Sequence, residues 1–135
     1  MLYRPFIHLI AWVLLPLAGA TAAAAPVSLE DDLKAIAENG EVVIGVREAA
    51  LPFAFIDRDG EASGYSIAIC KKIVDNLRQA LNRPDLRIRY NSMIALTRTL
   101  LVREKVVDME CGATSHTASR AKSFGFSLAF GVEQT

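Results

Sequence analysis

The sequence contains little of what catalytic and metal-binding proteins use. Among its 135 residues are two cysteines, two histidines and one tryptophan, and they do not recur at the spacings of metal ligands. A nucleophile elbow and a glycine-rich phosphate loop are also missing from the sequence. Fifteen basic residues balance fifteen acidic ones, so the charge does not favour nucleic acid or an anionic membrane as a partner. We therefore expect no metal, no cofactor and no nucleic-acid partner.

The first two dozen residues have the pattern of a secretory signal peptide. A short basic start over residues 1–4 precedes an apolar run over residues 6–17, and a cluster of small residues follows. The run is too short, and too interrupted by Pro16, for a membrane span. We predict a signal peptide over residues 1–24 that is cleaved after Ala24, with an uncleaved membrane anchor as the alternative. Residues 25–135 then form one exported domain with a modest core.

The two cysteines are separated by a long stretch of chain. Cys70 and Cys111 are too far apart for a CxxC motif, and export would place them in a compartment that permits disulfides. They can pair if the helix that carries Cys70 packs against the strand that ends at Cys111. Two buried free thiols are an equal alternative.

Helical and extended segments alternate along the exported part of the chain. Apolar periodicity and capping residues predict helices over residues 28–39, 66–81 and 93–102. Apolar or alternating runs predict strands over residues 41–47, 86–90 and 106–111, and residues 57–60 have the composition of a turn. Strands that alternate with helices predict an α/β fold, with a parallel sheet and flanking helices.

Polar residues follow the predicted strands at the edge where an open α/β sheet binds ligands. Arg47 ends the first strand, Arg98 follows the second, and Thr114, Ser115 and Arg120 follow the third. A guanidinium binds a carboxylate through two parallel hydrogen bonds and stays charged at any relevant pH. Each arginine alone is better explained as a solvated surface charge. Their joint placement at three strand ends favours a site for a ligand with more than one carboxylate.

Several spaced motifs occur in the order typical of one family. They are LKAIAENGEVVIGVREAALPFAFID (residues 33–57), GYSIAICKKIVDNL (64–77), NRPDLRIRY (82–90), VDMECGAT (107–114) and SRAKSFGFS (119–127). Together they resemble the periplasmic solute-binding proteins of polar amino-acid ABC transporters (family 3), particularly the glutamate/aspartate-binding branch. The resemblance covers about residues 29–127.

The resemblance implies a type II periplasmic-binding-protein fold, in which two lobes close on one free amino acid and deliver it to a membrane permease. Arg120 would then bind the α-carboxylate of the ligand, while Arg47 and Arg98 would bind its side-chain carboxylate. Thr114 and Ser115 would line the pocket with hydroxyl and backbone donors. The expected ligand is glutamate or aspartate in the periplasm, and the protein is expected to be a monomer.

The sequence departs from the pattern of this family in length and at particular residues. Residues 25–135 would make up only the N-terminal part of the first lobe, without the second lobe that grips the amino group of the ligand. The chain would be either part of a longer protein or a truncated product, and one lobe alone is expected to bind weakly because its ion pairs face solvent. Ala95 and Ala113 stand where serine is usual in the acidic-amino-acid branch, so two hydroxyl donors are missing.

Two other classes of function remain open on this scaffold. One is a periplasmic sensory or interaction module, because exported sensor kinases use the same lobe. The other, less favoured, is an enzyme that resembles a dehydratase, which needs an acid–base pair in the cleft. Glu48, Glu110 and His116 are the candidates for such a pair. We expect instead that Glu48 is a surface charge, Glu110 an ion-pair partner and His116 an exposed turn residue.

Overall fold

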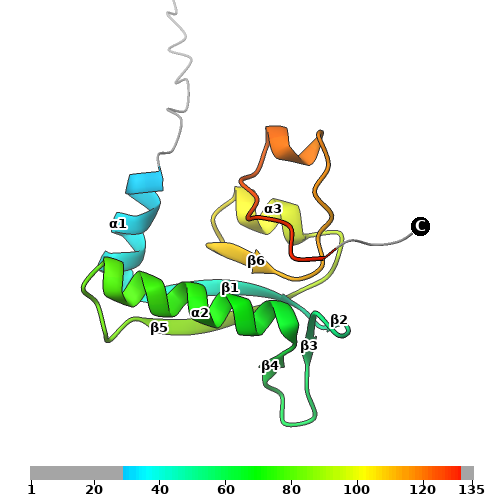
Figure 1. The fold of residues 1–135 in the computed structure, drawn as a ribbon, viewed down its shortest axis with the longest axis horizontal. Helices are drawn as coiled ribbons and strands as arrows, with labels where there is room; N and C mark the ends of the chain where they lie inside the picture. The colour runs from blue at the N-terminus through cyan, green and yellow to red at the C-terminus, as the bar shows by residue number, and fades with distance from the viewer. Residues whose placement is uncertain (1–28, 132–135) are drawn as a thin grey trace, which may run out of the picture.

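The computed structural model describes residues 29–131, so the signal peptide predicted over residues 1–24 lies outside the described residues. Within this range the chain forms one small parallel sheet, a second small antiparallel sheet and three α-helices (Figure 1). None of these helices is long and apolar enough to cross a membrane. The elements are α1 (Leu29–Asn39), β1 (Glu41–Arg47), β2 (Ala49–Ala50), β3 (Ala54–Ile56), β4 (Ala62–Ser63), α2 (Tyr65–Ala80), β5 (Arg87–Met93), α3 (Arg98–Arg103), β6 (Met109–Cys111) and a 3-10 turn, η1 (Arg120–Lys122).

The parallel sheet has the strand order β5–β1–β6, as the alternation of strands and helices predicts. β1 lies in the centre of the sheet and is buried from Val42 to Val46. Its apolar run is nearly continuous because side chains on both of its faces pack into the core. It pairs in parallel with β5 over its full length and with β6 over three residues. The carboxyl ends of all three strands therefore meet at one edge of the sheet.

Helices cover both faces of this sheet. On one face, Val42, Ile44 and Val46 of β1 pack with the apolar side of α2 in the larger core cluster, and Figure 1 shows α2 lying across β1 and β5. On the other face, Val43 belongs to a smaller cluster with Met93 and Val107, against which residues of α3 pack. Residues of β1 alternate between the two faces, as the strand geometry requires.

Three of the predicted boundaries are wrong, and tertiary contacts explain each difference. β5 continues to Met93, beyond the predicted end at residue 90, because it stays paired with β1 as far as Arg47. α3 consequently begins at Arg98, not at residue 93. β6 begins at Met109, not at residue 106, because the chain turns at Lys105, which has a positive φ of 55°.

The antiparallel sheet β2–β3–β4 lies at the amino end of α2 and fixes where that helix begins. The backbone N–H groups of Tyr65 and Ser66 donate to the carbonyl oxygens of Pro52 and Phe53, at 3.0 and 2.8 Å. Gly64 precedes the helix with φ of 118°, and a Cβ at this position would lie 2.4 Å from the carbonyl oxygen of Phe53. Only glycine allows this close approach of two backbone segments.

The turn between α2 and β5 contains an ion pair that makes stability depend on pH. The Arg83 guanidinium bonds both oxygens of Asp85, at 2.9 Å each, and also donates to the carbonyl oxygen of Ala37 in α1. This hydrogen-bonded guanidinium lowers the pKa of Asp85 to about 2. A lowered pKa in the folded state stabilises the protein above the unfolded pKa, about 4, and this contribution is lost as the pH falls towards 2.

We expect Asp85→Asn to reduce the pH dependence of stability between about pH 4 and pH 2. The variant lacks the carboxylate whose protonation destabilises the folded protein in this window. Urea unfolding at a series of pH values measures the effect, with Asp59→Asn as the control because Asp59 is exposed in a turn. Parallel stability curves for the Asp85→Asn variant and the wild type would contradict the prediction.

Candidate functional site

A cavity of about 260 Å³ opens beside β6, between α2, α3 and the segment that follows β6. Its polar lining comes from β6 and the segments on either side of it and from the starts of α2 and α3, and three phenylalanines of the segment after β6 also line it. The segment after β6 leaves the sheet, forms η1 (orange in Figure 1) and returns towards α3 and β6. The lining includes Ser66, Arg98, Glu110, Gly112, Thr114 and Phe126.

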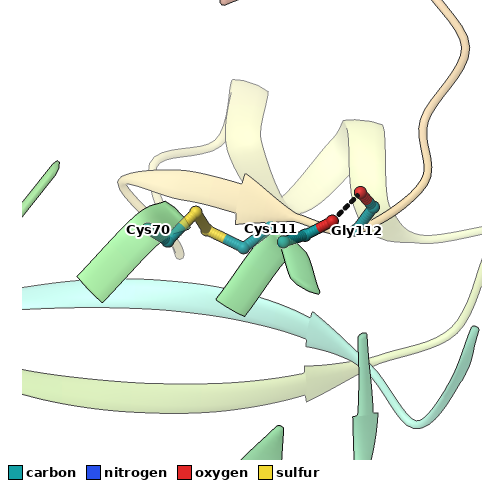
Figure 2. Close-up of a disulfide and its surroundings, with 4 residues drawn as sticks. Cys70, Cys111 and Gly112 are labelled. Carbon is teal, nitrogen blue, oxygen red and sulfur yellow. Dashed lines mark hydrogen bonds between the residues drawn. A yellow bond between two sulfur atoms is a disulfide. The ribbon is translucent and has the colours of Figure 1, made fainter. Parts of the chain in front are cut away.

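A hydrogen bond and a disulfide attach the end of β6 to α2 (Figure 2). The buried hydroxyl of Ser66 donates to the carbonyl oxygen of Gly112 at 2.8 Å, and Cys70 is bonded to Cys111. Ser66 and Cys70 are four residues apart and so lie on the same side of the helix. The two bonds hold consecutive residues of the strand end, so the turn that begins at Gly112 has a fixed position on α2. Of the two alternatives for the cysteines, the structure shows the disulfide.

Arg98 and Thr114, two of the five predicted site residues, line this cavity together. Arg98 is the first residue of α3, and its side chain forms no ion pair or hydrogen bond within residues 29–131. The Thr114 hydroxyl oxygen is buried and has no hydrogen-bond partner in the described part of the chain. A cation and a hydroxyl without partners in one cavity can both bind an anionic ligand group.

The other three predicted residues lie outside the lining. Arg47 ends β1 next to Gly112, where its Cδ is 3.6 Å from the place that a Cβ of Gly112 would occupy. Arg120 lies in η1, and its guanidinium donates to the carbonyl oxygen of Ser115 at 2.9 Å. Arg47 is thus at the carboxyl edge of the sheet, while Ser115 and Arg120 are joined to each other in the segment after β6.

The three candidate acid–base residues do not come together. Glu48 is exposed and accepts a hydrogen bond from the Ser92 hydroxyl at 2.6 Å. His116 is exposed and packs edge-on against Phe126, with ring centroids 4.9 Å apart. Only Glu110 lines the cavity, and contrary to the expectation from the sequence it forms no ion pair with any residue from 29 to 131.

The sequence reasoning missed two parts of this site. Ser66 was assigned only to the start of a helix, because its bond to Gly112 joins positions 46 residues apart. The other part is the pair Phe124 and Phe126, which alternate with other residues in the sequence. In the structure they are half-buried, lie outside the strands of the described residues, and line the cavity. An apolar side chain in an alternating pattern signals burial but does not say against what it is buried.

The chain matches the bacterial extracellular solute-binding proteins, family 3, over residues 42–135. It belongs to this family. The described residues have the parallel sheet and flanking helices of a type II periplasmic binding protein, and they cover part of that fold.

Curated relatives in this family are binding proteins for acidic amino acids. The chain is 38% identical over 101 residues to the L-glutamate/L-aspartate-binding protein of Pseudomonas aeruginosa, which is 74% of this chain and 33% of that protein. It is 35% identical over 95 residues to the glutamate/aspartate import solute-binding protein of Escherichia coli, 70% of this chain and 32% of that protein. The chain therefore spans about a third of the length of these relatives.

Solved structures share the fold and differ in ligand. The solute receptor for L-cysteine of Neisseria gonorrhoeae is 30% identical, with a TM-score of 0.58 over 67% of this chain and 35% of that one. The arginine-bound domain 1 of TmArgBP has the same TM-score at 20% identity, over 67% of this chain and 64% of that one. At 20% identity, the likeness to TmArgBP domain 1 shows the fold alone. The family accordingly supports amino-acid binding, while these neighbours differ from the curated relatives in the amino acid.

Proposed function

We propose that residues 25–135 are the N-terminal part of the first lobe of a periplasmic solute-binding protein that binds glutamate or aspartate. The observation that carries the proposal is a pair of groups in the cavity that have no partner among residues 29–131, the Arg98 guanidinium and the buried Thr114 hydroxyl. A carboxylate would satisfy both through charge-assisted hydrogen bonds. The 35–38% identity to glutamate/aspartate-binding proteins supports an acidic ligand.

The remaining predicted residues have roles in this proposal that involve movement of side chains. Arg47 reaches the side-chain carboxylate from the end of β1, on the sheet edge next to Gly112. Arg120 exchanges the carbonyl oxygen of Ser115 for the α-carboxylate of the ligand. The exchange favours the ligand because a hydrogen bond to a carboxylate is about twice as strong as one to a neutral carbonyl. Ser115 contributes backbone and hydroxyl donors.

The cellular role follows from the same proposal. Residues 1–24 direct export to the periplasm as a cleaved signal peptide, the loaded protein delivers its amino acid to an ABC permease, and it acts as a monomer. The import proteins among the relatives support this role.

The test is calorimetric titration of the full chain with L-glutamate, L-aspartate, L-cysteine and L-arginine. We expect the acidic pair to bind most tightly, and we expect Arg98→Ala and Arg120→Ala each to weaken glutamate binding by roughly tenfold or more, the loss of a charged hydrogen bond. Arg87→Ala is the matched control, since Arg87 is an exposed arginine at the amino end of β5. Preference for L-cysteine or L-arginine, or equal losses in all three variants, would overturn the assignment.

A further inference from the structure

The disulfide between Cys70 and Cys111 forms part of the wall of the cavity beside β6. Both cysteines belong to the larger core cluster, and both also line the cavity. Figure 2 shows the bond between α2 and the end of β6. It therefore lies where the apolar core meets the cavity, and a molecule in the cavity can approach it although most of its surface is covered.

The two cysteines differ in how far they are covered. Cys70 is 8% exposed and Cys111 is 2% exposed, so Cys70 is the more accessible partner. Thiol–disulfide exchange requires a thiolate to reach one of the two sulfur atoms, and its rate depends on that access. The cavity volume of about 260 Å³ is below the roughly 300–1,000 Å³ of pockets for drug-sized ligands. The cavity is thus suited to a thiol of a few carbon atoms and too small for the thiol of another protein.

Cleavage of this bond would change how the turn after β6 is attached to α2. Cys111 directly precedes Gly112, whose carbonyl oxygen accepts the Ser66 hydroxyl at 2.8 Å. An open disulfide leaves this hydrogen bond to hold the turn on the helix. Thr114, which lines the same cavity, lies two residues further along the turn. The state of the disulfide therefore affects where the polar groups of the cavity lie.

We propose that Cys70 is a site of thiol–disulfide exchange with small thiol compounds that enter the cavity. The thiolate sulfur of the compound attacks the Sγ atom of Cys70 and forms a mixed disulfide with it. The bond between Cys70 and Cys111 breaks, and Cys111 leaves as a thiolate. Attack by this thiolate on the mixed disulfide expels the compound and restores the original bond. The exchange makes the attachment of the turn to α2 depend on the concentration of small thiols, whichever amino acid the protein binds.

The first test measures how fast 2-mercaptoethanol and glutathione open the disulfide in the folded full chain. Each rate is divided by the rate of the same thiol on the urea-unfolded chain, so that the intrinsic reactivities of the two thiols cancel. We expect the normalised rate to be roughly tenfold or more higher for 2-mercaptoethanol, because the smaller thiol fits the cavity and glutathione does not. Peptide mass mapping after acid quenching should locate the mixed disulfide on Cys70. Equal normalised rates, or a mixed disulfide on Cys111 alone, would overturn the proposal.

A second measurement distinguishes attack on the folded chain from attack on molecules that have unfolded transiently. Opening through global unfolding accelerates with urea as the free energy of unfolding falls, whereas attack through the cavity of the folded chain is nearly independent of urea below the unfolding transition. We expect the rate with 2-mercaptoethanol to stay nearly constant in this range. A urea dependence equal to the equilibrium m-value would show that the thiol reaches the disulfide only after unfolding, and the proposal would be wrong.

Gly125→Leu tests the route through the cavity without a change at the disulfide. Gly125 lines the cavity, and nothing lies within 4 Å of the position that its Cβ would take. We expect this variant to slow opening by 2-mercaptoethanol roughly fivefold or more, because the larger side chain reduces access. Ser123→Leu is the matched control, since Ser123 is exposed in the same segment and is not among the lining residues. Equal rates for Gly125→Leu and the wild type would rule out this route, whether or not the chain binds L-glutamate.

Discussion

Replacement of both Cys70 and Cys111 by alanine is expected to lower the free energy of unfolding by about 4 kcal/mol, because the disulfide closes a long loop in the unfolded chain. The two residues are 41 positions apart, and cross-linking at this separation restricts the unfolded chain strongly. Both residues are buried, at 8% and 2% exposure, so the alanines also remove packed sulfur atoms. Urea denaturation of the wild type and the double variant measures the loss.

If the proposed function holds, the same variant should also bind L-glutamate less tightly than the wild type. Cys111 directly precedes Gly112, and the disulfide and the Ser66 hydroxyl together attach this turn to α2. Without the disulfide, one hydrogen bond holds the end of β6 on the helix. Reductant serves as the control, because it should destabilise the wild type and leave the double variant unchanged. A loss of stability below about 1 kcal/mol would mean that the disulfide constrains the unfolded chain far less than its loop length implies.

Gly64→Ala is expected to destabilise the protein by roughly 3 kcal/mol or more, through backbone strain and a steric clash together. The residue has φ of 118°, where side chains are strained, and its Cβ would lie 2.4 Å from the carbonyl oxygen of Phe53. This oxygen also accepts the backbone N–H of Ser66. The clash is with backbone, so a rotamer change cannot relieve it. Displacement of the helix start would also move the Ser66 hydroxyl away from Gly112.

Gly60→Ala separates the two causes of this destabilisation. Gly60 also has a positive φ, of 81°, but nothing lies within 4 Å of the position that its Cβ would take. The substitution should therefore cost only the left-handed strain, about 1 kcal/mol. Denaturant unfolding of the two variants gives the comparison. Equal losses for Gly60→Ala and Gly64→Ala would show that contact with Phe53 contributes nothing.

The sequence alone predicted the class of fold and much of the element order. The continuous apolar run of β1 and the helical periodicity of α2 are local patterns, and both elements formed within a residue of the predicted bounds. The family followed from motifs spaced along the chain, and the match over residues 42–135 confirms it. Local backbone preferences and hydrophobic periodicity depend on residues that are close together in the chain. They can therefore be predicted from the sequence alone.

Element ends were the weaker part of the prediction. β5 extends to Met93 because β1 pairs with it as far as Arg47. The length of a neighbouring strand cannot be predicted from the residues of β5 alone. For the same reason the sequence left the pairing of Cys70 with Cys111 open. Both depend on which segments pack together, and packing is decided by the whole chain.

For the site, the sequence identified residue types and the edge of the sheet, and the tertiary structure decided which of them meet. Arg98 and Thr114 share a cavity, Arg120 bonds Ser115 outside it, and Glu110 is left without a partner among the described residues. Ser66 reaches Gly112 across 46 positions. The placement of these residues in the sequence thus predicted a site for an anion. The surroundings of each charge depend on segments far apart in the chain, so only the folded arrangement determined which charges stay free for a ligand.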